Sequence, residues 1–168
     1  SLAVAAVLVG HGADPCALAL GNRTPLHFAT MKGNLPLVRF MMESGGAVDC
    51  VTSEGWTLLH VASSRGFVQV VQYLLGNGGR TSLEAMTTHM RTPLNLAARK
   101  GHIPCVDLLL RSGANCRPVA LDWLPIHSAV GRGAYDILLL MLNHDPTLVD
   151  ERSKLAKTSL HLAASLGH

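Results

Sequence analysis

Aromatic residues are scarce in this chain, where Phe, Trp and Tyr together make up 4% of 168 residues. Hydrophobic residues nevertheless reach 48%, which is ample for a buried core. Small and aliphatic side chains must therefore fill that core, as expected when thin layers of structure pack closely.

Charged residues are also few, at 15%, and the net charge is only +3. A dedicated nucleic-acid-binding domain usually has a pI above about 9 and clusters of basic residues. The composition therefore gives no argument for a nucleic-acid partner.

Long apolar runs are missing as well. The longest outside the N-terminal stretch covers residues 137–142, whereas a membrane-spanning helix needs about 20 residues. Residues 2–9 could be mistaken for the core of a signal peptide, but no initiator Met or basic leader precedes them, and they fit the repeat register described below. We expect no membrane insertion in this segment.

The four cysteines show no Cys-x-x-Cys spacing and no metal-ligand grouping. Cys16 and Cys50 occupy the same repeat position, so stacked layers would hold them about 8–10 Å apart, beyond the roughly 7 Å that a disulfide allows. Free thiols are expected, which favours an intracellular compartment, the cytoplasm, with the nucleus left open.

Catalytic constellations are also absent, since no nucleophile elbow, paired carboxylates or Cys–His dyad can be found. The glycine-rich residues 76–79 follow a predicted helix and open none, whereas a phosphate-binding loop joins a strand to a helix. Residues 22–24 match a glycosylation acceptor, but Thr24 is better placed as a helix cap. We predict no enzymatic activity, no cofactor and no metal.

What the chain does contain is a six-residue motif in five copies. They begin at Thr24, Thr57, Thr92, Leu124 and Thr158 and read TPLHFA, TLLHVA, TPLNLA, LPIHSA and TSLHLA. The intervals of 33, 35, 32 and 34 residues indicate a repeat architecture. Thr suits a helix N-cap and Pro the first helical position, so each copy predicts a helix start.

Glycines predict where the helices end. A Gly follows each first helix and another stands twelve residues later, in the pairs Gly33–Gly45, Gly66–Gly78 and Gly101–Gly113, while Gly133 is paired with Asp145. Each pair brackets a second apolar helix. Every unit is thus helix, turn, helix and loop, and such units bury their apolar faces only by stacking.

The period, the Thr-Pro-Leu-His opening, the Gly-His pair at residues 101–102 and the sequence LLLRSGA at residues 108–114 resemble the ankyrin repeat. The resemblance covers essentially the whole chain and implies an all-α solenoid of stacked antiparallel helix pairs with β-hairpin-like loops. We expect one array over residues 1–168, cut from a longer array. Residues 1–12 would be the second helix of a truncated repeat, residues 146–168 the first half of a further one, and the complete units would cover about 13–45, 46–78, 79–113 and 114–145.

Five positions depart from the family pattern. Leu58 and Ser159 replace Pro, Leu124 replaces Thr, Asn95 replaces His, and Met90 stands where Gly is usual. The longest loop, residues 79–91, is therefore the least certain part of the prediction. Asp145, in place of Gly, predicts a turn of different geometry.

Four copies of the motif contain a histidine, which could be a metal ligand or a structural residue. These histidines recur once per repeat and so belong to different layers, and no acid or cysteine accompanies them at ligand spacing. In the ankyrin family this His hydrogen-bonds the backbone of the neighbouring unit. The resemblance therefore implies a structural role for Thr24, His27, Thr57, His60, Thr92, His127, Thr158 and His161.

Two columns of residues remain as candidates for partner binding. The residue before each motif is Arg23, Trp56, Arg91, Trp123 and Lys157, and the residue that closes each first helix is Lys32, Arg65, Lys100, Arg132 and then Leu166. Cations near a helix C-terminus are favoured by the helix dipole by about 0.3–1 kcal/mol, and the tryptophans could simply pack on neighbouring loops. The alternative is a binding strip, because Trp and Arg often carry interface energy and a cationic column favours an acidic partner segment.

The favoured function is a non-catalytic protein-protein interaction module that holds a partner on the concave face of loops and first helices. The alternative is the recruiting segment of a larger protein, such as a ubiquitin-ligase adaptor, an enzyme or a channel. A third alternative is nucleic-acid contact through the basic column, which would require a steep loss of affinity with added salt.

Overall fold

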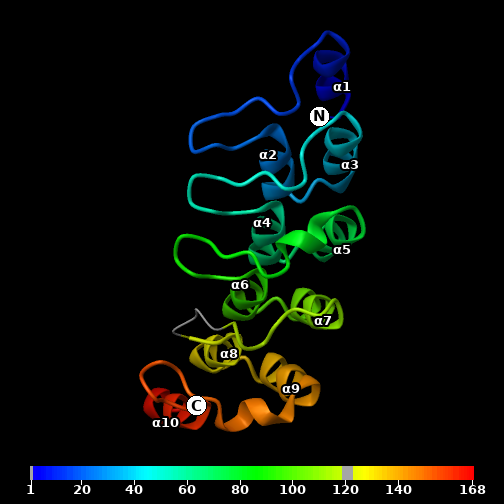
Figure 1. Cartoon of the computed structure of the whole chain (residues 1–168). Helices are drawn as coiled ribbons and strands as arrows, with labels where there is room; N and C mark the ends of the chain where they lie inside the picture. The colour runs from blue at the N-terminus through cyan, green and yellow to red at the C-terminus, as the bar shows by residue number, and fades with distance from the viewer. Residues whose placement is uncertain (1, 119–122) are drawn as a thin grey trace.

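A computed structural model describes residues 2–118 and 123–168 of the chain (Figure 1). The described residues form α-helices joined by turns and loops, and β structure within them is limited to isolated bridges. The α-helices are α1 (Leu2–Gly10), α2 (Pro25–Met31), α3 (Leu35–Glu43), α4 (Leu58–Arg65), α5 (Val68–Gly76), α6 (Pro93–Lys100), α7 (Ile103–Arg111), α8 (Pro125–Arg132), α9 (Tyr135–His144) and α10 (Ser159–Leu166). Two short 3₁₀ helices are η1 (Gly79–Ser82) and η2 (Pro146–Asp150).

The helices stack in pairs along one direction, from α1 at one end to α10 at the other (Figure 1). The first helices α2, α4, α6, α8 and α10 form one file, and the second helices α3, α5, α7 and α9 form a file beside it (Figure 1). Loops project from the file of first helices. The predicted all-α solenoid of stacked helix pairs is thus confirmed.

Each first helix except α8 begins at a Thr cap. In α4, the Thr57 Oγ1 atom accepts a hydrogen bond from the main-chain N–H of His60. The same cap is made by Thr24, Thr92 and Thr158. Leu124 has no side-chain oxygen, and α8 lacks this bond.

The turn between the two helices of a unit requires glycine for two reasons. Gly33 has a φ of +66°, a conformation that L-residues adopt only with strain. In addition, a Cβ atom at Gly33 would lie 2.8 Å from the Phe67 ring of the next unit. This glycine therefore permits both the turn and the close approach of the neighbouring layer.

Alanine makes the layers thin. Ala29, Ala62, Ala97 and Ala129 stand at the same position of four consecutive first helices, and each is at most 2% exposed. Around them, Leu and Val side chains from both helix files form one continuous apolar core. The low aromatic content of the chain follows from this packing, because a ring at these positions would push the layers apart.

The loops differ from the prediction in two places. A 3₁₀ turn, η1, begins at Gly79, whereas no helix was expected after the glycine-rich residues 76–79, and η2 occupies part of the fifth loop. Met90 has a φ of +56°, in the left-handed region where the family pattern has Gly. The turn at Asp145 does differ from the glycine turns, since its φ is −145° and its carboxylate is paired with Arg117.

Four cysteines are free thiols, and Cys105 and Cys116 are buried. Within residues 2–118 and 123–168, no helix combines the length and the hydropathy that a bilayer crossing requires.

Candidate functional site

The repeated histidines lie in separate layers and do not meet. In α4, the main-chain N–H of Thr57 donates to Nδ1 of His60 over 3.1 Å, so the ring proton lies on Nε2. Nε2 then donates to the carbonyl oxygen of Arg91, 2.9 Å away on the next loop. Each imidazole of this type therefore joins its own helix cap to the following unit.

The carbonyl that receives this hydrogen bond belongs, in three units, to the residue just before the next motif. His27 Nε2 lies 3.3 Å from the oxygen of Trp56, and Asn95 Nδ2 donates to the oxygen of Trp123 over 3.1 Å. The amide of Asn95 thus replaces the imidazole. His27, His60 and Asn95 therefore form a buried column. Their side chains hold the main chain of three residues that were predicted to bind a partner, namely Trp56, Arg91 and Trp123.

The last two histidines differ. His127 Nε2 lies 3.2 Å from the carbonyl oxygen of Glu151, six residues before Lys157 in the sequence. The ring of His161 is exposed, and its Nδ1 atom contacts the hydroxyl of Thr158 at 2.8 Å. Lys157 is therefore not held as Trp56, Arg91 and Trp123 are.

Burial keeps these imidazoles neutral. It lowers the pKa of His60 to about 4, and it also lowers the pKa of His27 and His127. In the part of the chain that the structure describes, no group of three His, Cys, Asp or Glu side chains could hold a metal ion.

One cysteine does accompany a histidine, which corrects the sequence interpretation. Cys50, from the next unit, places its Sγ atom 3.6 Å from Nδ1 of His27 and 3.5 Å from Oγ1 of Thr24. The spacing in sequence hid this contact because it forms between layers. Burial raises the pKa of the Cys50 thiol, so the pair lacks the thiolate that a Cys–His nucleophile needs.

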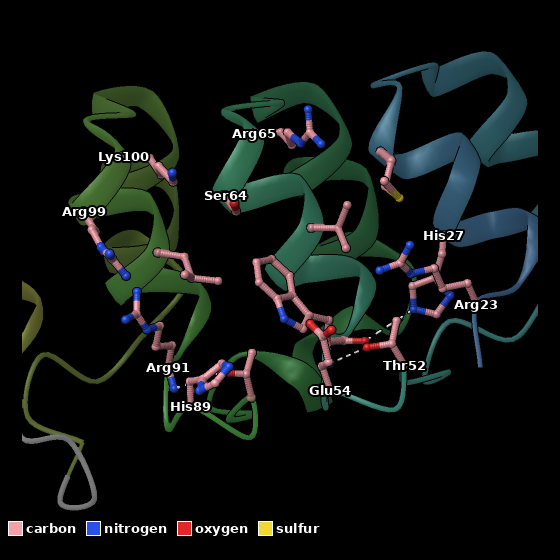
Figure 2. Close-up of a pocket in the computed structure, with 15 residues that line it drawn as sticks. Arg23, His27, Thr52, Glu54, Ser64, Arg65, His89, Arg91, Arg99 and Lys100 are labelled. Carbon is pink, nitrogen blue, oxygen red and sulfur yellow. Dashed lines mark hydrogen bonds between the residues drawn. The ribbon is translucent and has the colours of Figure 1, made fainter. Parts of the chain in front are cut away.

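A groove of about 680 Å³ runs across three consecutive units, along α2, α4 and α6 and the loops before them (Figure 2). We call it the cationic groove. It is lined by Arg23, His27, Met31, Thr52, Glu54, Trp56, Val61, Ser64, Arg65, Thr87, His89, Arg91, Leu96, Arg99 and Lys100.

The charge of this lining is strongly unbalanced. Five side chains are permanent cations, namely Arg23, Arg65, Arg91, Arg99 and Lys100, and Glu54 is the one acid among the lining residues. Among the described residues, no carboxylate forms an ion pair with any of these five cations. The groove therefore presents unneutralised positive charge to whatever enters it.

The loops that form one side of the groove are tied to each other. Ser53 N–H donates to the carbonyl oxygen of Gly21 over 2.9 Å, and Thr88 N–H donates to that of Glu54 over 3.0 Å. The Trp56 ring packs 6.1 Å from the ring of His60, centroid to centroid. The main chain of these loops and the Trp56 ring are consequently held in place before a ligand binds.

Five of the nine predicted binding residues meet in this groove: Arg23, Trp56, Arg91, Arg65 and Lys100. The lining does not include the other four, Lys32, Trp123, Arg132 and Lys157. Figure 2 shows Arg65 and Lys100 toward one end of the helices, and Glu54 and His89 on the loop side. The groove therefore brings together three residues of one predicted column, Arg23, Trp56 and Arg91, with two of the other, Arg65 and Lys100.

The side chain of Arg132 packs against the turn of the preceding unit. In two units, a ring lies over the turn glycine of the preceding unit: Phe67 over Gly33 and His102 over Gly66. Each ring belongs to the residue directly after the turn glycine of its own unit. The equivalent residue of the next unit is Ala134, which has no ring. The side chain of Arg132 lies over Gly101 instead.

Sequence reasoning missed Arg99 and His89. Arg99 directly precedes the predicted Lys100, and the Arg-Lys pair at the end of α6 was the signal available for it. His89 lies at the tip of the third loop, where no periodic pattern pointed to it.

A second hollow, of about 520 Å³, lies between α8, α9, η2 and α10. Its lining is mainly apolar and includes Val130, Leu138 and Leu160. It carries no cluster of like charges, in contrast to the cationic groove.

Comparison with known proteins gives three overlapping matches to one family model, described as ankyrin repeats (3 copies), at residues 1–85, 26–120 and 94–168. Together these matches cover the whole chain.

Curated relatives are similar over most of this chain. Ankyrin repeat protein nuc-2 of Neurospora crassa is 30% identical over 149 residues, which is 88% of this chain and 14% of the relative. E3 ubiquitin-protein ligase KEG of Arabidopsis thaliana is 28% identical over 163 residues, 90% of this chain and 8% of the relative. Probable E3 ubiquitin-protein ligase XBOS33 of Oryza sativa subsp. japonica is 31% identical over 157 residues, 88% of this chain and 30% of the relative. The chain thus spans between 8% and 30% of the length of these relatives.

Proposed function

Because this chain belongs to the ankyrin-repeat family, whose repeats are general protein-interaction modules, we propose that it holds a protein partner in the cationic groove without chemical catalysis. The observation that carries this proposal is the set of five unpaired cations around the half-buried Trp56 in one groove. Trp and Arg are the side chains that most often dominate binding energy, and unpaired charge speeds encounter with a complementary surface.

The partner surface that suits this groove is acidic. Removing a carboxylate from water costs less when several cations replace its hydration, and Glu54 alone opposes them. Trp56 supplies the apolar contact that charge alone does not give. Arg23, Arg65, Arg91, Arg99 and Lys100 surround this contact. The other four predicted residues lie outside the lining of the groove and are not part of the proposed site. They are Lys32, Trp123, Arg132 and Lys157.

The test is capture of partners by the full-length protein, compared with a charge-reversed variant, Arg65→Glu with Lys100→Glu. A matched control is Arg80→Glu with Arg152→Glu, which makes the same change of charge at exposed positions outside the groove. We expect the groove variant to lose the partners that wild type and control retain. Retention of every partner by a folded groove variant would refute the proposal.

A second candidate function is recruitment of substrates within a larger protein. Two of the relatives are named as E3 ubiquitin-protein ligases, and the chain covers only a small part of each. The full-length coding sequence discriminates between the candidates, because a catalytic domain beside these repeats would favour recruitment. Ubiquitin transfer to a captured partner, lost with the groove variant, would establish it.

The proposed compartment is intracellular, the cytoplasm or the nucleus. The four free thiols support it, because reducing compartments keep such cysteines reduced. Imaging of the tagged full-length protein tests this assignment, and secretion into the medium would contradict it.

A further inference from the structure

We propose that the cationic groove recognises an extended peptide in the polyproline II conformation, with an acidic, an apolar and an acidic residue at positions i, i+3 and i+6. This inference rests on the proposed function and specifies its ligand. It starts from three side chains, Arg23, Trp56 and Arg91, which we call the three rungs.

The three rungs stand at the same position of three consecutive units and all line the groove. Two of them have their main chains fixed from the preceding layer, Trp56 by His27 and Arg91 by His60. The order along the stack is therefore cation, indole, cation, repeated at the spacing of the layers.

That spacing selects the conformation of the ligand. Neighbouring helices pack about 8–10 Å apart. A polyproline II chain has three residues per turn and a rise of about 3.1 Å, so every third residue returns to the same face after about 9 Å. In a β-strand, residues on one face recur after about 6.6–7 Å and fall out of step with the rungs.

An α-helix brings residues i and i+7 to one face after about 10.5 Å, which is longer than the layer spacing of about 8–10 Å. The polyproline II repeat of about 9 Å lies within that spacing, and a polyproline II chain has little conformational entropy left to lose on binding.

Charge sets the residue type at each position. Arg23 and Arg91 form no ion pair within the described residues, so acids at positions i and i+6 would gain partners. At the middle rung Trp56 offers an apolar surface, and Glu54 comes from the same loop. An acid at position i+3 would face Glu54, whereas a Leu would contact the indole.

The experiment uses two synthetic peptides of identical composition and charge. The first is Glu-Pro-Pro-Leu-Pro-Pro-Glu, and the second is Pro-Glu-Pro-Leu-Pro-Glu-Pro, in which the acids move to two residues from Leu. Fluorescence anisotropy with the full-length wild-type protein gives the Kd of each. We expect the first peptide to bind at least tenfold more tightly, and equal affinities would overturn the inference.

A variant isolates the middle rung. Trp56→Ala is expected to weaken binding of the Leu peptide about tenfold and to leave unchanged a version with Ala in place of Leu. An equal loss for both peptides would show that Trp56 acts through folding, and the inference would fail. The peptide comparison on wild-type protein needs no variant and stands apart from this risk.

Two further outcomes separate this inference from the proposed function. If both peptides bind alike while Arg65→Glu with Lys100→Glu still abolishes partner capture, the groove binds protein but not this pattern. If a single-stranded RNA oligonucleotide binds more tightly than either peptide and loses affinity steeply with salt, the ligand is nucleic acid and both proposals are wrong.

Discussion

The Nε2 atom of His60 lies 2.9 Å from the carbonyl oxygen of Arg91, 31 residues further along the chain. One residue of this pair is buried in the framework and the other lines the cationic groove. A single hydrogen bond therefore holds the two layers together and positions a side chain of the proposed binding surface. Changes in the buried column should alter stability and binding together.

Acid should destabilise the array through its buried histidines. The pKa of His60 is about 4 in the folded chain and 6.5 when unperturbed, so the unfolded chain binds more protons between these values and stability falls as pH drops through that window. Between pH 7.5 and pH 5 this group alone should remove about 2 kcal/mol from the free energy of unfolding. Urea denaturation at both pH values measures the loss.

The chain supplies the control for that measurement. Asn95 occupies the His position of its own unit and makes the same bond to the next loop. His60→Asn should therefore fold, keep the hydrogen bond and lose much of the pH dependence. An unchanged pH dependence in this variant would show that other groups cause it.

Gly33→Ala should be more destabilising than Gly45→Ala. Both glycines have positive φ, which costs an L-residue about 1–2 kcal/mol. A Cβ atom at Gly33 also meets the Phe67 ring at 2.8 Å, whereas the space around Gly45 is open. Overpacking should add about 1–3 kcal/mol for Gly33→Ala, as measured by denaturation. The difference should shrink in a Phe67→Leu background, and its persistence there would argue against the ring contact.

Met90→Gly should stabilise the chain. Met90 has a φ of +56°, and the residue is 44% exposed and lies outside the apolar core, so only partial burial is lost. Release of left-handed strain, about 1–2 kcal/mol, outweighs the added backbone entropy of Gly, about 0.5–1 kcal/mol. A rise in Tm is the expected readout. The opposite change at the equivalent position, Gly55→Ala, should lower Tm, and a fall for both would contradict the strain argument.

Thr57→Ala should cost about 1–2 kcal/mol of stability. The Thr57 hydroxyl is buried, caps α4 and contacts Nδ1 of His60 at 2.9 Å. Thr57→Ser keeps the hydroxyl and should retain most of the stability. Equal losses for Ala and Ser in thermal unfolding would mean that the methyl group, not the cap, matters.

Helix starts and ends were predictable because their signals are local. A Thr cap, a Pro in the first turn and a Gly in the left-handed conformation each act within a few residues, so five copies at a steady interval were enough to infer stacked helix pairs. The 3₁₀ turn at Gly79 was missed because it lies in a loop with no repeated pattern.

The sequence by itself determined the repeating unit, the all-helical class and the recurrence of Thr and His in the helix-start motif, whereas the structure showed that Asn95 makes the bond to the next loop in its own unit. Only the tertiary structure decided which long side chains share a groove. Arg99 joins it, whereas Arg132 lies over Gly101, at a position where the two preceding layers have a ring. Flexible cations take their direction from the neighbouring layer, and contacts between layers, such as that of Cys50 with His27, leave no mark in the spacing of residues along the chain.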